Sequence, residues 1–92
     1  MTITIQIGNT DNKLTQQKWS QFIKSMNEQL LHHAINVHFA GGSNYDQQWQ
    51  NACWVIEISP EIEPGLKLSL SLLKLHFDQH SIAYTIGATQ LL

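Results

Sequence analysis

The side chains that could carry out covalent chemistry in this chain are few. Cys53 is the only cysteine, and the predicted sheet places it on the same face as His38 and Glu57, so a thiol, a base and an orienting carboxylate are all present. No oxyanion hole is identifiable, and a cysteine in the middle of a strand most often packs as a small apolar residue. We therefore predict no catalytic residue and favour binding over catalysis, with an enzyme that uses Cys53 and His38 as the third hypothesis.

Five histidines raise the question of a metal site. His32 and His33 are adjacent, so on a helix their side chains point about 100° apart and cannot easily share an ion. His76 and His80 are four residues apart and would lie on one face only if a helix continues through His80. Because no third ligand has a recognisable spacing, we predict neither a metal nor another cofactor.

Polar amides are the most distinctive part of the composition. The 92 residues include ten Gln and six Asn but only five lysines and no arginine, and the formal net charge is −2. An amide both donates and accepts hydrogen bonds, which suits recognition of a small polar molecule; amides that only face water are the alternative interpretation. The shortage of cationic side chains argues against duplex nucleic acid as a partner.

The pattern of apolar residues predicts the elements that must position these side chains. Alternation with period two indicates strands near residues 2–8, 35–40, 52–58 and 82–86. A helix follows Thr15, which is a good N-cap residue, and carries one apolar stripe. That stripe consists of Trp19, Phe22, Ile23, Met26, Leu30 and Ala34.

The segment 66–77 allows two interpretations. With period two it is a strand with a leucine face; with helical period it has two apolar stripes, and its length and leucine content favour the helix. A helix that is apolar on two sides has more to bury than one sheet can cover. We therefore predict a homo-oligomer contact through this helix, with shielding by Leu91 and Leu92 as the alternative. The two stripes are Leu66, Leu70, Leu73 and Phe77, and Leu68, Leu72 and Leu75.

The order β-α-β-β-α-β is the split βαβ arrangement, so we predict one α+β domain over residues 1–92, a ferredoxin-like sandwich. Right-handed crossovers give a four-stranded antiparallel sheet of order 4-1-3-2 with both helices on one face. The open face would lack the aromatic residues on which RNA-binding domains of this shape stack bases. A lone cysteine, no signal peptide and no membrane-length apolar run predict a cytoplasmic protein without a membrane partner.

This topology brings three connections to one end of the sheet, at residues 8–14, 41–51 and 78–81. The middle connection is long for a hairpin and holds polar and aromatic residues, and such loops are common binding sites. Tyr45 and Trp49 could stack on a planar ring; plugging the open end of the core is their alternative role. We predict a ligand site on this rim, made of Asn9, Asp11, Asn12, Ser43, Asn44, Tyr45, Trp49, Gln50, Asn51 and His80.

Three stretches are distinctive together: residues 7–19, which begin Ile-Gly-Asn-Thr-Asp-Asn-Lys-Leu-Thr; residues 49–54, Trp-Gln-Asn-Ala-Cys-Trp; and residues 81–87, Ser-Ile-Ala-Tyr-Thr-Ile-Gly. In them the chain resembles small uncharacterised proteins of bacteria, notably actinobacteria, and of their bacteriophages. The likeness spans nearly the whole chain and supplies no catalytic residue. It implies a phage or mobile-element context, in which very small proteins often act by binding and some sequester the nucleotide signals of bacterial immune systems.

The leading hypothesis is a non-enzymatic, oligomeric binding module in the cytoplasm, that of the host cell if the protein is phage-encoded. Its ligand would be a small polar molecule, such as a nucleotide-derived immune signal, and its role anti-defence. The absence of arginine counts against a ligand with several phosphates. The second hypothesis is a protein-interaction module that inhibits a host protein through the open sheet face or the second helix.

Overall fold

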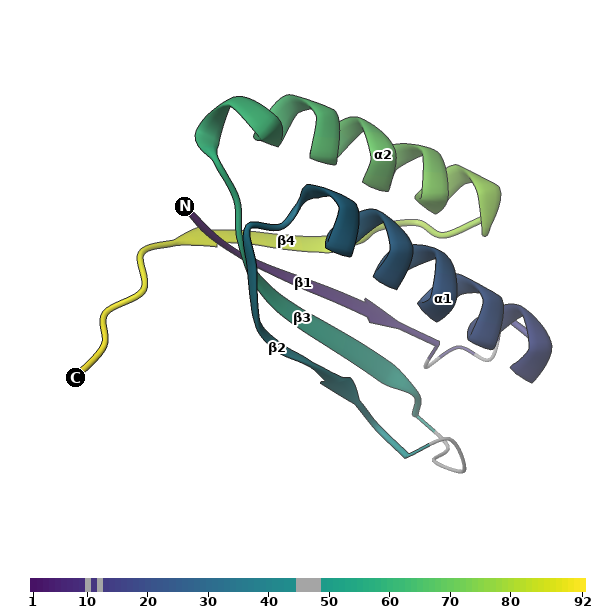
Figure 1. The fold of residues 1–92 in the computed structure, drawn as a ribbon. Coiled ribbons are helices and arrows are strands. Elements are labelled where there is room, and N and C mark those ends of the chain that lie inside the picture. Colours follow the sequence, from purple (N-terminus) through teal and green to yellow (C-terminus); the bar gives the residue numbers. More distant parts are fainter. Residues whose placement is uncertain (10, 12, 45–48) are drawn as a thin grey trace.

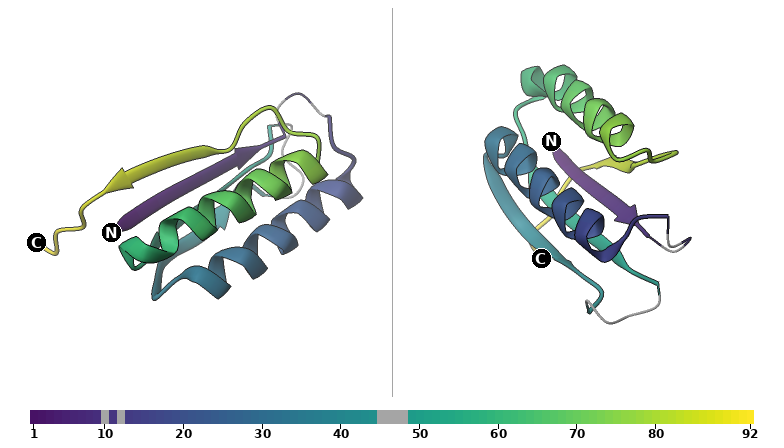
Figure 2. Two further views of the ribbon diagram at one scale, coloured as in Figure 1. Left: turned by 90° about the horizontal axis from the view of Figure 1, so that it is seen from above. Right: turned by 90° about the vertical axis from the view of Figure 1, so that its right-hand side faces the viewer.

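The computed structural model describes residues 1–9, 11, 13–44 and 49–92. It has two layers, a four-stranded sheet and two helices that lie side by side on one face of it (Figures 1 and 2). The elements follow the predicted order, with one 3₁₀ turn before the second helix. They are β1 (Thr2–Gly8), α1 (Gln16–His33), β2 (Asn36–Gly42), β3 (Asn51–Glu57), η1 (Pro60–Ile62), α2 (Glu63–His76) and β4 (Ala83–Gly87).

The sheet is antiparallel between all its neighbouring strands, in the order β2-β3-β1-β4. That order is the same as 4-1-3-2, and it confirms the predicted ferredoxin-like α+β fold. β1 is a central strand, with Ile5 opposite both Trp54 of β3 and Tyr84 of β4. β2 and β4 are the two edges, each paired on one side only within the described part of the chain.

The core lies between the sheet and the helices. The three isoleucines of β1 are at most 5% exposed, because strand alternation aims all of them at the helical layer. Phe22 of α1 and Phe77, just beyond α2, stack with ring centroids 4.8 Å apart and so join the two helices. The buried apolar residues are Ile3, Ile5, Ile7, Trp19, Phe22, Met26, Leu30, Ala52, Trp54, Ile56, Ile58, Leu66, Leu70 and Phe77.

Polar side chains fix α1 at its start and along its length. The Oγ1 atom of Thr15 accepts a hydrogen bond from the backbone N–H of Lys18 at 3.2 Å, which confirms the predicted N-cap. Farther along, the indole Nε1 of buried Trp54 donates to Asn27 Oδ1 at 2.6 Å. The one polar atom of that ring is therefore satisfied inside the protein.

β2 departs from the predicted alternation. Its register against β3 shifts between Val37, which lies opposite Ile56, and Phe39, which lies opposite Val55. This bulge places Phe39 on the sheet face away from the helices, where it is 53% exposed. Strict alternation over the predicted strand 35–40 would place Val37 and Phe39 on one face, and it fails here because the extra residue His38 resets the period-two pattern.

Residues 63–76 form a helix, which confirms the helical interpretation of this leucine-rich segment. The helix ends in a Schellman motif: Asp78 has a left-handed φ of 54°, and the N–H of Gln79 donates to the carbonyl of Lys74 at 2.8 Å. Across the described ranges of the chain, neither helix is long and apolar enough to cross a bilayer.

The three leucines on the outer side of α2 are not covered. Leu68, Leu72 and Leu75, called the outer leucines below, are 62%, 58% and 71% exposed. The C-terminal segment runs away from α2 (Figure 1), and Leu91 and Leu92 are themselves almost fully exposed. Shielding by the C-terminal leucines is therefore not what this structure shows.

We expect Gly42→Ala to destabilise the domain by about 1–3 kcal/mol, because a Cβ there would overlap the carbonyl oxygen of Asn51 and force the β2–β3 backbone apart. Gly87→Ala is the matched control, since nothing lies within 4 Å of its added Cβ. That variant should stay within about 0.5 kcal/mol of the parent in urea denaturation. Equal stability of the two variants would contradict the close approach at Gly42.

Candidate functional site

The connections β1–α1, β2–β3 and α2–β4 meet at one end of the sheet (Figure 1). The backbone N–H of Asn9 donates to the carbonyl of Gln50 at 2.8 Å and so joins the first connection to the second. Lys13 Nζ lies 3.3 Å from Asp78 Oδ2 and joins the first to the third. The end of the sheet with these connections is called the loop end below.

Two buried amides organise the loop end. The side chain of Asn9 accepts from the N–H of Leu14 and donates to the carbonyl of Leu14, both at 3.0 Å, and it also donates to Gln50 Oε1 at 3.1 Å. Gln50 in turn exchanges two side-chain hydrogen bonds with Gln16, at 2.6 and 3.0 Å. Asn9 and Gln50 are each 1% exposed. Their amides therefore hold the connections to the start of α1, and neither reaches the surface.

The remaining residues of the predicted rim are spread over different surroundings. Trp49 is 64% exposed, and Asp11 and Asn44 are exposed as well. Ser43 and Asn51 line a shallow hollow of about 230 Å³ between α1 and the ends of β2 and β3. Asn12 and Tyr45 lie outside the described residues.

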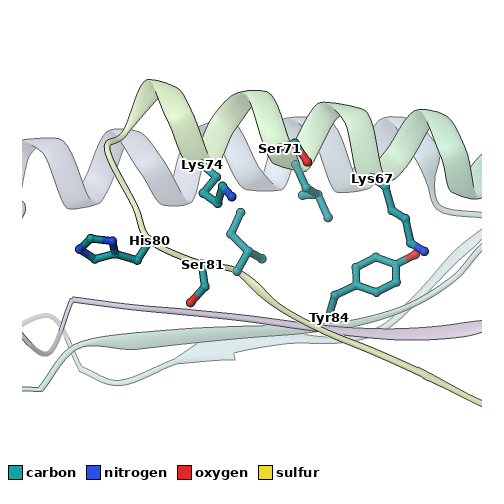
Figure 3. A pocket seen from close by; sticks show the side chains of 8 residues that line it. Lys67, Ser71, Lys74, His80, Ser81 and Tyr84 are labelled. Carbon is teal, nitrogen blue, oxygen red and sulfur yellow. The ribbon is translucent and has the colours of Figure 1, made fainter.

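A larger cavity, of about 320 Å³, opens between α2 and β4, and it is called the α2–β4 cavity below. β4 is an edge strand, and α2 extends over it. Among the described residues, no further strand lies beyond β4 to fill the space under the helix. Side chains reach the cavity from α2, from β4 and from the connection between them (Figure 3). The lining residues are Lys67, Leu70, Ser71, Lys74, His80, Ser81, Ile82 and Tyr84.

At one end of this cavity, the side chains of Glu63, Lys67 and Tyr84 satisfy one another's charges and hydrogen bonds. The hydroxyl of Tyr84 donates to Glu63 Oε2 at 3.1 Å, and Lys67 Nζ lies 3.6 Å from Glu63 Oε1. The same ammonium lies 5.3 Å from the centroid of the Tyr84 ring, within cation–π range. Burial and the hydrogen bond to Glu63 raise the pKa of Tyr84 well above its usual value. The phenol therefore keeps its proton and remains a hydrogen-bond donor at neutral pH.

A separate polar cluster lies on the open sheet face, at the end opposite the loops. The carboxylate of Glu57 accepts hydrogen bonds from Thr2 Oγ1 and, at 3.2 Å, from Thr89 Oγ1. It also contacts His38 Nε2 at 3.1 Å and the amino group of Met1 at 3.2 Å. The hydrogen bond from Thr2 first, and then the contacts with His38 and with the amino group of Met1, hold the pKa of Glu57 at about 2, well below the ordinary value of 4.5.

Cys53 is not part of that cluster. It is half-buried in β3, where its register partners are Gln6 on β1 and Gly41 on β2. Glu57, which the His38 imidazole contacts, lies four residues farther along β3, or about 13 Å of strand. The structure therefore brings His38 to the carboxylate but not to the thiol.

The histidines do not gather into a ligand set. α2 ends at His76, and His80 follows the left-handed turn at Asp78, so these two imidazoles do not share one helical face. His33 Nδ1 instead pairs with the carbonyl of Gln29 at 2.8 Å. Over the described residues, no group of three His, Cys, Asp or Glu side chains is placed to hold a metal ion.

Comparison with known proteins found no match: neither a family model, nor a curated protein, nor a solved structure matches the chain. The resemblance to small bacterial and phage proteins stays a prediction.

Of the residues that line the α2–β4 cavity, only His80 belongs to the predicted ligand set. A signal for the others was present, because Lys67, Ser71 and Lys74 recur at spacings of four and three and so form a polar stripe between the two leucine stripes of α2. Which side of the helix faces β4 depends on how α2 packs on the sheet, and sequence periodicity alone does not predict that orientation.

We expect Asn9→Ala to lower the free energy of unfolding by about 1–3 kcal/mol, because it removes three side-chain hydrogen bonds and leaves the backbone N–H and carbonyl of half-buried Leu14 without their partner. Trp49→Ala, at a neighbouring but exposed position, should change it by no more than about 0.5 kcal/mol. Urea denaturation of both variants measures this. If Asn9→Ala is as stable as the parent, the buried amides do not hold the loop end together.

The lowered pKa of Glu57 predicts a loss of stability in acid. A depressed folded-state pKa contributes stability above the unfolded value of 4.5, and that contribution disappears as the pH falls from 4.5 toward 2. Thermal melts of the parent and of Glu57→Gln should therefore differ most above pH 4.5 and converge near pH 2. Thr2→Val keeps the carboxylate but removes its main hydrogen bond, so its acid loss should be smaller than that of the parent. A difference between parent and Glu57→Gln that stays constant over this range would contradict the assignment.

Proposed function

We propose that this domain is a non-enzymatic binding module that captures a small polar ligand in the α2–β4 cavity. The observation that carries the proposal is the lining of that cavity, where cationic and hydroxyl side chains face an apolar wall of Leu70 and Ile82. Small-molecule sites combine these two features, a mostly apolar surface with a few polar groups that orient the ligand. The position at the edge of the sheet, below the C-terminal half of α2, leaves the cavity open to solvent.

The size of the cavity limits the ligand. A volume of about 320 Å³ lies at the lower end of the range of roughly 300–1,000 Å³ that is typical of ligand pockets. A mononucleotide or a smaller molecule is the appropriate scale. A nucleotide-derived signal, the ligand class that the resemblance implies, is compatible with the cavity if it carries few phosphates.

The same lining favours binding over chemistry. Three side chains of the lining could act as a base for Ser71 or Ser81, namely Lys67, Lys74 and His80. Among the described residues, neither serine hydroxyl is hydrogen-bonded to any of them. A serine nucleophile requires an adjacent base that is itself held in place by a third group. The arrangement therefore lacks the relay on which such catalysis depends.

Isothermal titration against a panel of nucleosides, mononucleotides and cyclic nucleotides tests the proposal. We expect at least one member to bind, and at 100 times its Kd to stabilise the fold by about 2.7 kcal/mol. Ser71→Trp should abolish this binding, because an indole on the exposed helix position would fill the cavity. Ser20→Trp, on an exposed position of α1, should bind normally. Absence of both heat and melting shift with every member would refute the proposal.

A second candidate function is self-association through α2, and the exposure of the outer leucines favours it. These side chains lie at spacings of four and three, on the side of α2 opposite the buried Leu66 and Leu70, whereas Lys67 and Lys74 lie on the side that faces β4. A charge-free apolar stripe is typical of the core of an interface. We propose a second copy of this chain as its occupant, because an isolated helix face of this kind can pack on its own symmetry mate.

Sedimentation equilibrium tests this second candidate. We expect a concentration-dependent dimer, and Leu72→Gln should weaken it by about a hundredfold, since each of the two copies loses the burial of one leucine side chain, worth roughly 1.5 kcal/mol. Leu31→Gln is the matched control, because Leu31 is similarly exposed (64%) but lies on α1. A parent chain that remains monomeric up to millimolar concentration would exclude the α2 contact.

A further inference from the structure

We infer that the α2–β4 cavity selects a ligand with a single anionic group, held by Lys74, and with an apolar or planar body. The inference rests on the proposed function, because it names the ligand class of the same cavity. It follows from a difference between the two lysines of the lining. The positive charge of Lys67 is compensated by a carboxylate of the protein, and that of Lys74 is not compensated among the described residues.

Lys67 is the compensated lysine. Its ammonium is 3.6 Å from Glu63 Oε1 and lies over the Tyr84 ring, and the hydroxyl of Tyr84 donates to the other oxygen of the same carboxylate. Figure 3 shows the Lys67 side chain descending from α2 to the side of Tyr84. An anion that approached this end of the cavity would meet Glu63 just behind the lysine, so it would gain little.

Lys74 is the uncompensated lysine. It is half-buried at the other end of the cavity, and Figure 3 shows its side chain hanging from α2 into the space above β4. The nearest acidic residue along the chain, Asp78, pairs instead with Lys13 at 3.3 Å, and within the described ranges Lys74 has no ion pair. A half-buried ammonium without a counter-ion favours an anion in the space that it faces.

The surroundings of Lys74 supply the rest of a recognition site. The hydroxyls of Ser71 and Ser81 line the same cavity, and Leu70 and Ile82 form its apolar wall, while Figure 3 shows the His80 imidazole pointing away from Lys74. A ligand that places a phosphate or carboxylate at Lys74 can therefore lay a ring or an aliphatic chain along that wall. Since Lys74 is the one uncompensated lysine of the lining among the described residues, a second or third phosphate would be desolvated without a partner.

Pairs of probes that differ only in charge test the inference by isothermal titration: a nucleoside against its 5′-monophosphate and triphosphate, and an aromatic carboxylate against its amide. We expect the anion of each pair to bind about ten to a hundred times more tightly than its neutral partner, as for a hydrogen bond to a charged group. The two pairs distinguish a phosphate from a carboxylate source. The triphosphate should bind no more tightly than the monophosphate.

Two conservative variants separate the roles of the lysines. Lys74→Gln should remove the preference for the anion and leave the weaker binding of the neutral probe intact, whereas Lys67→Gln should retain the preference. Both side chains lie at the margin of the cavity, and circular dichroism melts confirm that each variant is folded.

The outcomes are distinguishable. If neutral and anionic probes bind equally, or if Lys67→Gln and Lys74→Gln lose the preference alike, the inference is wrong while the binding function stands. A triphosphate that binds tenfold more tightly than the monophosphate would refute the limit to one anionic group. If no probe of either charge binds, the proposed function fails and the inference fails with it.

Discussion

Burial of the three isoleucines of β1 is the constraint on which the rest of the structure depends. Ile3, Ile5 and Ile7 point to one side of a central strand, so a helical layer must cover that side over its whole length. Two β-α-β crossovers provide the cover, one with α1 and the other with α2. The opposite sheet face and the outer sides of the helices are consequently left to solvent. The surfaces that could bind a partner are therefore those that do not take part in covering the isoleucines of β1.

The loop end shows how an amide-rich composition can serve the fold. Asn9 and Gln50 are buried where two chain connections cross, and a buried amide without partners would cost about 1–3 kcal/mol. The structure satisfies them with each other, with Gln16 and with the backbone of Leu14. Such a network holds only in one geometry, so it fixes the connections relative to α1. These two amides are part of the scaffold that positions the surface.

The fold could be predicted from the sequence because the sequence patterns that indicate its helices and strands are periodic and local. Alternating isoleucines indicate β1, one apolar stripe indicates α1, and the element order then allows few topologies. Two kinds of feature were not accessible. The bulge beside Phe39 adds one residue to a strand without any change in residue type that would mark it. The buried state of Asn9 and Gln50 depends on which loops meet, since an amide in a polar loop has the same letter whether it faces water or the protein interior.

α2 carries the strongest link between sequence and candidate function, because one helix presents three different stripes. Leu66 and Leu70 enter the core, Lys67 and Lys74 face β4, and the outer leucines face solvent, in steps of about 100° per residue. Since the cavity side and the outer side belong to one rigid helix but share no residue, ligand capture and self-association are separable by substitution. The two candidate functions therefore describe different sides of the same element, and neither excludes the other.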